Sequence, residues 1–157
     1  MAALRKQPSP GPEPDARKRA MGLLAKATRA ELEKAWEALD AKPAVAPVRG
    51  PETGLVMVRG RIGGGGAPFN LGEVTATRAS VRLEDGVVGH GQTLGSDGEK
   101  ARLAAVFDAL LQGSEHEATV RRLLDEVAAR IEADDAKKAR ETAATRVDFF
   151  TMVRGDD

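Results

Sequence analysis

Four arginines set among glycines are the residues of this chain best suited to bind an anion. One pair precedes a run of four glycines, and the other pair flanks Ser80. Guanidinium groups bind phosphates and carboxylates through paired hydrogen bonds, and glycine lets a bound group approach the backbone closely. The predicted anion or subunit contacts are Arg59, Arg61, Gly63, Gly64, Arg78, Arg82 and His90.

The glycine run at residues 63–66 has two interpretations. Backbone amides of such a run can cradle a phosphate, but no Lys-Ser or Lys-Thr follows it and Pro68 comes two residues later. It therefore matches neither a P-loop nor a dinucleotide-binding fingerprint. We predict a flexible connecting loop, with a loop that becomes ordered against a partner or substrate as the alternative.

Residues for covalent or metal chemistry are few. The chain has no cysteine and two histidines, His90 and His116, which fall in different predicted elements. Ser80 has no evident base near it in sequence, and Asp134 and Asp135 point about 100° apart if they lie on a helix. No metal-ligand spacing is present. We therefore predict no catalytic residue, no metal ligand and no self-sufficient active site in this chain.

The arginines must be positioned by strands. Residues 77–83 alternate apolar and polar side chains, residues 55–62 form a short apolar run, and Asp85-Gly86 is typical of a two-residue type I′ hairpin turn. That turn would place His90 beside Val81 on the apolar face. The opposite face would be either an anion-binding surface with uncovered glycine amides or a plain solvated one. The predicted pairs are Glu84 with Val87, Leu83 with Val88, Arg82 with Gly89, Val81 with His90, and Ser80 with Gly91.

Apolar residues at helical spacing surround this sheet. Capping-box patterns at Thr28, Ser96 and Ser114 mark three helix starts, and an earlier helix is plausible from Asp15. Residues 42–51 read as a linker with one edge strand around 45–49. The predicted fold is α+β, with a small antiparallel sheet within Leu55–Leu94, two short N-terminal helices and two longer C-terminal ones. Residues 1–14 form a predicted disordered proline-rich tail, and 15–157 a single domain.

The last twelve residues, RVDFFTMVRGDD, are unusually apolar for a chain end. Aromatic and methionine side chains between arginines resemble an interface core with a polar rim. We predict partner docking, with a last strand that completes the sheet as the alternative. The predicted docking residues are Phe149, Phe150, Met152 and Arg154.

Composition limits the partners. The 157 residues include 24 Lys and Arg against 24 Asp and Glu, with four Phe, one Trp and no Tyr. A neutral chain with few aromatics is a poor binder of nucleic acid or membrane, and we expect neither. No long apolar run or signal-peptide pattern is present, so the expected location is the cytoplasm.

From Met21 onward the sequence resembles the PhnG family, whose members belong to the bacterial carbon-phosphorus lyase system for phosphonates. The resemblance rests on four stretches: RAMGLLAKATRAEL, ETGLVMVRGRIGGGG, FNLGEVTATRASVRLEDGVVGHGQTLG and the terminal RVDFFTMVRGD. The central and terminal motifs are specific in combination.

The resemblance implies an accessory subunit of the carbon-phosphorus lyase core complex, together with subunits H, I and J, on which the ATP-binding-cassette components K and L dock. That complex converts ATP and methylphosphonate to alpha-D-ribose 1-methylphosphonate 5-triphosphate, displacing adenine, in alkylphosphonate catabolism. ATP is then a substrate of the complex, an iron-sulfur cluster and S-adenosylmethionine belong to the J component, and this chain needs no cofactor. The alternatives are an independent phosphate- or nucleotide-binding enzyme using Gly63–Gly66, or a purely architectural subunit.

Overall fold

The computed structural model describes residues 12–62 and 65–145. Among these residues, four helices and one three-stranded antiparallel sheet follow each other in an α+β arrangement, which confirms the predicted fold class. None of the described helices is both long and apolar enough to pass through a membrane. In chain order the elements are α1 (Pro14–Lys26), α2 (Arg29–Glu37), β1 (Val45–Arg61), β2 (Pro68–Leu83), β3 (Val88–Leu94), α3 (Gly98–Leu111) and α4 (Glu117–Ala144).

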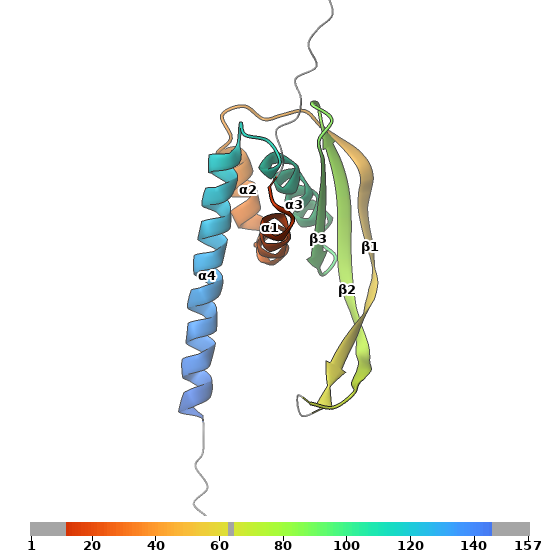
Figure 1. Cartoon of the computed structure of the whole chain (residues 1–157), viewed down its shortest axis with the longest axis vertical. Coiled ribbons are helices and arrows are strands. Elements are labelled where there is room, and N and C mark those ends of the chain that lie inside the picture. The colour runs from red at the N-terminus through yellow and green to blue at the C-terminus, as the bar shows by residue number, and fades with distance from the viewer. Residues whose placement is uncertain (1–11, 63–64, 146–157) are drawn as a thin grey trace, which may run out of the picture.

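The elements form three layers (Figure 1). The sheet is one outer layer, α1, α2 and α3 lie in the middle, and α4 lies on the far side of these helices. Helix α3 packs on β2 and β3 and is buried around nearly its whole circumference, with Phe107 at the centre of the core. The helices cover one face of the sheet. The opposite face, called here the outer face, has no described element packed on it.

Local sequence signals explain most helix ends. Pro14 occupies the first turn of α1, where its missing N–H costs nothing. Thr28 and Glu31 form the predicted capping box of α2. The other two boxes were wrong: Asp97, not Ser96, accepts the Lys100 backbone N–H at the start of α3, and α4 begins without a side-chain cap.

The sheet is longer than the sequence indicated. Strand β1 begins at Val45 and passes Pro47 and Pro51, which confirms the predicted edge strand at 45–49 and shows that only residues 42–44 of the predicted linker lie outside the strand. Its pairing with β2 is irregular between Pro47 and Glu52. Because β1 is an edge strand, prolines and bulges are tolerated there.

The β2–β3 hairpin differs from the prediction by one residue. The Leu83 N–H donates to the Val87 carbonyl, and the Gly86 N–H donates to the Leu83 carbonyl, each at 2.9 Å. Only Gly86 of the loop has positive φ, at 90°. The connection is therefore a three-residue loop ending in a left-handed glycine, rather than a two-residue type I′ turn.

This single-residue change moves side chains to the other face of the sheet. Val81 pairs with Gly89 and Ala79 with Gly91, so both glycines lie on the buried face against α3. Ser80 pairs with His90, which places His90 on the outer face and corrects its predicted position beside Val81. The prediction that glycine backbone amides lie uncovered beside the arginines is wrong for the same reason, because both glycines lie on the buried face.

Gly89 and Gly91 let α3 approach the sheet closely. A Cβ at Gly91 would overlap the Ala101 carbonyl oxygen, and one at Gly89 would overlap the Ala105 carbonyl oxygen. The two glycines thus meet successive turns of the helix. Helix backbone lies directly against strand backbone at this point.

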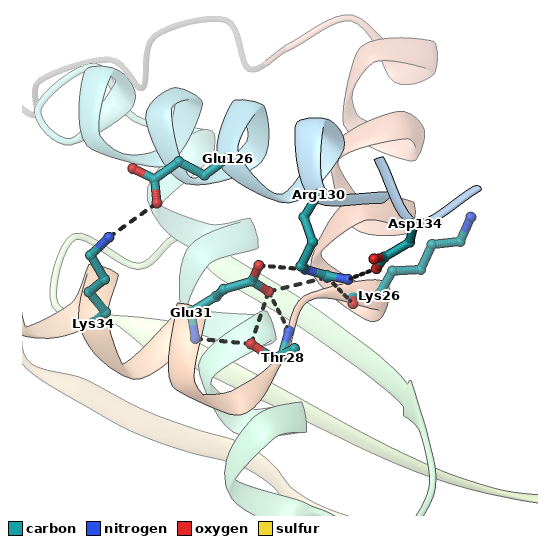
Figure 2. Close-up of polar contacts among 7 residues, drawn as sticks. All are labelled: Lys26, Thr28, Glu31, Lys34, Glu126, Arg130 and Asp134. Carbon is teal, nitrogen blue, oxygen red and sulfur yellow. Dashed lines mark hydrogen bonds and ion pairs between the residues drawn. The ribbon is translucent and has the colours of Figure 1, made fainter. Parts of the chain in front are cut away.

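Helices α1, α2 and α4 are joined by a polar cluster (Figure 2). Arg130 of α4 donates to both carboxylate oxygens of Glu31, at 2.6 and 3.2 Å, and to the Lys26 carbonyl at 3.0 Å. Glu31 also accepts the Thr28 N–H. Burial alone would raise the pKa of Glu31, but the hydrogen bonds from Arg130 and Thr28 outweigh it and lower that pKa.

We expect Gly91→Ala to destabilise the chain by about 2 kcal/mol or more, because the new methyl group meets helix backbone that cannot rotate away. Urea unfolding of the full chain measures the change. Gly54→Ala is the matched control: nothing lies within 4 Å of its Cβ position, so that variant should be as stable as the wild type or slightly more so. Equal losses in both variants would contradict the close packing of α3.

We expect Glu31→Gln to keep the helix cap but lose the ion pair with Arg130, costing about 1 kcal/mol near neutral pH. The lowered pKa of Glu31 means that this contribution is present above the ordinary carboxylate range and is lost as pH falls through the folded-state pKa. Unfolding curves from pH 7 to pH 3 should therefore converge for variant and wild type. Glu126→Gln, which removes the exposed pair with Lys34, should change stability by less than about 0.5 kcal/mol at any pH.

Candidate functional site

The outer face of the sheet gathers charged and polar side chains from all three strands. Across the three strands, Ser80 of β2 pairs with Arg49 of β1 and with His90 of β3. In the next row of paired residues, Arg78 of β2 pairs with Glu52 and Gln92. Arg82 lies one row further along β2, opposite Val88. Three arginines against one glutamate make this surface cationic. We call it the outer-face patch, and its members are Arg49, Glu52, Arg78, Ser80, Arg82, His90 and Gln92.

Glu52 holds two of these arginines. Its carboxylate lies 3.2 Å from Arg49 Nε and 3.3 Å from Arg78 Nη2, and all three side chains are about half exposed. Exposed pairs of this kind contribute little stability, so an incoming anion can compete for either guanidinium group at small cost. Arg82 forms no ion pair with the described residues, so its charge is available without competition.

The surface is hollowed next to these arginines. The hollow has a volume of about 250 Å³, and Arg78, Gln92 and Glu52 lie at its polar end. Gly54 and Ala76, which pair with each other, also line it, and the lack of a bulky side chain at either position leaves space. A phosphate or carboxylate group fits such a site, because a guanidinium and an amide can donate to it from one side.

Ser80 and His90 form the one contact in the patch that resembles a nucleophile and its base. Ser80 Oγ lies 2.9 Å from His90 Nδ1. Among the described residues no carboxylate bonds to the other ring nitrogen, and the imidazole is exposed. A nucleophile needs an oriented base in a site that excludes water. We therefore assign the pair to hydrogen bonding rather than to covalent chemistry.

The predicted arginines do not form a single site. Arg59 and Arg61 pair with Asn70 and Pro68, near the far end of the β1–β2 hairpin. Arg59 lies seven positions after Glu52 on β1, which corresponds to about 23 Å of extended strand. Arg78, Arg82 and His90 lie together in the outer-face patch.

Six predicted residues lie outside the described ranges: Gly63, Gly64, Phe149, Phe150, Met152 and Arg154. Arg61 Nη1 donates to the Gly66 carbonyl at 3.2 Å, so this arginine lies against the described part of the glycine loop. Within residues 12–62 and 65–145, no three His, Cys, Asp or Glu side chains are placed to hold a metal ion.

Sequence reasoning missed Arg49, Glu52 and Gln92. They belong to the patch because of strand register, and the part of β1 that holds Arg49 had been predicted to be mainly a linker. It also missed Asp108, which is fully buried on α3. A signal for Asp108 was available, because it is a charged residue on the same helix face as Ala101 and Ala104.

Asp108 positions the strand that carries His90. Its carboxylate accepts the His90 backbone N–H at 2.8 Å and two hydrogen bonds from Arg17 of α1, at 3.0 and 2.8 Å. The hydrogen bonds that Arg17 donates to Asp108 raise the pKa of the Arg17 guanidinium, so this arginine keeps its positive charge beside the buried carboxylate. Gln112 Nε2 donates to the Val88 carbonyl at 2.9 Å. Asp108 and Gln112 thus bond to two backbone groups on the free edge of β3, at His90 and Val88.

We expect Arg17→Met to destabilise the chain by about 3 kcal/mol, because it leaves a fully buried carboxylate without its counter-charge. Thermal or urea unfolding measures the loss. Arg29→Met removes an exposed arginine paired with Glu33 and should cost only about 0.5 kcal/mol. Losses of the same size in both variants would show that Asp108 does not depend on Arg17.

Comparison with known proteins identifies the family of this chain. The family model described as phosphonate metabolism protein PhnG matches residues 15–155. A relative from Rhizobium meliloti (strain 1021), named alpha-D-ribose 1-methylphosphonate 5-triphosphate synthase subunit PhnG, is 67% identical over 141 residues, which cover 90% of each chain. Both findings confirm the resemblance seen in the sequence, and the chain belongs to the PhnG family.

Proposed function

We propose that this chain is an accessory subunit of alpha-D-ribose 1-methylphosphonate 5-triphosphate synthase. The observation that carries this proposal is the 67% identity, over 90% of both chains, to a protein that bears the name of that subunit. The reaction is the displacement of adenine from ATP by methylphosphonate, in the catabolism of alkylphosphonates. We assign the chain a supporting role in it, in the cytoplasm.

The geometry of the described residues supports an accessory role. Their polar side chains gather on the outer face of the sheet, on which no described element packs. The Ser80–His90 contact lacks an orienting carboxylate within the described ranges. Such a surface can bind and orient an anion, but it does not exclude water from a reacting centre.

The proposed partners are subunits H, I and J, with components K and L acting on the same assembly. We propose that the outer-face patch receives an anionic group, either a phosphate of the substrate or a carboxylate of a neighbouring subunit. Arg82 and Arg78 are its principal donors. Gly63 and Gly64 beside Arg59 and Arg61 remain proposed contacts, as do the docking residues Phe149, Phe150, Met152 and Arg154.

The test is reconstitution of the complex from the full chain with subunits H, I, J and L, followed by measurement of adenine release from ATP and methylphosphonate. We expect the wild-type chain to enter the complex and support release. An Arg78→Ala/Arg82→Ala variant should lower kcat/KM by about tenfold or more, because it removes charge-assisted hydrogen bonds to the anion. Arg121→Ala is the matched control, since Arg121 is an exposed arginine paired with Glu117 on α4, away from the sheet.

The assembled fraction separates the two kinds of anion. Normal assembly with slow adenine release identifies a substrate phosphate, whereas weakened assembly identifies a carboxylate of another subunit. If assembly and adenine release both stay at the wild-type level, the patch binds neither a substrate phosphate nor a carboxylate of another subunit. A chain truncated after Arg146 tests the docking residues in the same assay and should fail to assemble. Adenine release by the isolated chain would contradict the accessory role.

A further inference from the structure

The part of the β1–β2 hairpin beyond β3 projects from the body of the molecule. Strand β3 ends at Leu94, opposite Ala76, whereas β1 and β2 continue to pair as far as Arg61 and Pro68. We call residues 54–62 and 65–75 the arm. Figure 1 shows the arm as a two-stranded ribbon that extends past the ends of α1, α2 and α3.

Apolar side chains are concentrated on the arm. Of the nine large hydrophobic side chains exposed among the described residues, seven lie on it. Leu55 is 65% exposed and Leu71 is 64% exposed. The other two, Val48 and Leu94, belong to the base of the sheet. An apolar surface confined to one projecting element is typical of an interaction site.

Both faces of the arm are apolar. Leu55 and Met57 share a face with Thr53, whose hydroxyl meets that of the buried Thr77, so they continue the face that the helices cover further up. Val56 pairs with Val74 on the opposite face, which continues the outer face. No other described element packs on either side at this point. A two-stranded ribbon alone is marginally stable in water, so burial of both faces would stabilise it.

Charge at the far end indicates the nature of the partner. Arg59 and Arg61 lie next to the loop, while the arm's one carboxylate, Glu73, pairs with Met57 nearer its middle. Arg59 forms no ion pair with a described residue. A cleft that receives the arm would therefore need apolar walls and carboxylates at its closed end.

A second copy of this chain does not provide such a cleft in the described residues. Outside the arm, its exposed large hydrophobic side chains are Val48 and Leu94, which are too few to form two apolar walls. Contact between two arms would bury one face of each ribbon and leave the other in water. Within the described residues, a second copy therefore does not bury both faces of the arm, which favours a different polypeptide as the partner.

We propose that the arm inserts between two apolar walls of another subunit of the synthase, whose carboxylates meet Arg59 and Arg61. This inference rests on the proposed function, because it takes the partner from that complex. It goes beyond that function by naming the element that enters the partner and by requiring contact on both of its faces.

The test places a lysine on each face in turn. Leu55→Lys and Val56→Lys should each weaken association of the full chain with subunits H, I and J by at least about tenfold, because each puts a charge into an apolar contact. Leu94→Lys is the matched control, since Leu94 is 72% exposed on β3, outside the arm, and should change association less than about twofold. All three side chains are exposed, Val56 the least at 41%, so unfolding curves of the isolated variants should stay close to the wild type.

A photocrosslinking residue at Met57 identifies the occupant directly. In the assembled complex it should form a product with another subunit. A product with a second copy, or with residues 146–157 of the same chain, would overturn the proposal. Loss of association in only one of the two lysine variants would also overturn it, because the arm would then lie flat on the partner with one face in water. Unchanged association in both variants would overturn it as well. Failure of the wild-type chain to enter the complex would instead refute the proposed function.

Discussion

The contact between α3 and β3 is the constraint on which the structure depends. Gly89 and Gly91 bring helix backbone against strand backbone, and Asp108 on the same helix accepts a hydrogen bond from the strand edge. Arg17 neutralises that carboxylate from α1. The contact therefore joins the sheet, the central helix and the first helix. It also turns His90 and Gln92 outward, because the alternate residues of β3 are held inward.

The same contact gives the sheet two different edges. The β3 edge is occupied by Asp108 and Gln112, which use backbone groups that would otherwise pair with another strand. The β1 edge has no such cover among the described residues, and it continues into the arm. Among the described residues, the outer face, the β1 edge and the arm are therefore open to other polypeptides, while the first half of the β3 edge is partly occupied by Asp108 and Gln112.

Part of this organisation could be predicted from the sequence, because it depends on local signals. The four helices follow from apolar spacing and from caps such as Thr28 with Glu31. The hairpin was recognised at Asp85-Gly86, but its register was not. An Asp-Gly pair suits a two-residue turn, and it also suits the last two positions of a three-residue loop. Only packing against α3 decides between them, since the other register would move Gly89 and Gly91 off the buried face.

The candidate site depended on that register, which is why the arginines were identified but their neighbours were not. Glu52 and Arg49 reach Arg78 across a strand irregularity that no local pattern indicates. The arm was unpredictable for a related reason: residues 55–62 were recognised only as a short apolar run, and sequence cannot tell whether such a run is buried within the chain or exposed on it.

The arm also affects how the chain behaves between its synthesis and its assembly with a partner. A ribbon with apolar side chains on both faces and open backbone edges is the kind of segment that seeds aggregation or recruits chaperones and proteases. A chain synthesised in excess of its partner would carry this liability until it was degraded. Balanced synthesis of the subunits, or assembly as the chain leaves the ribosome, would then govern how much of it accumulates in the cell.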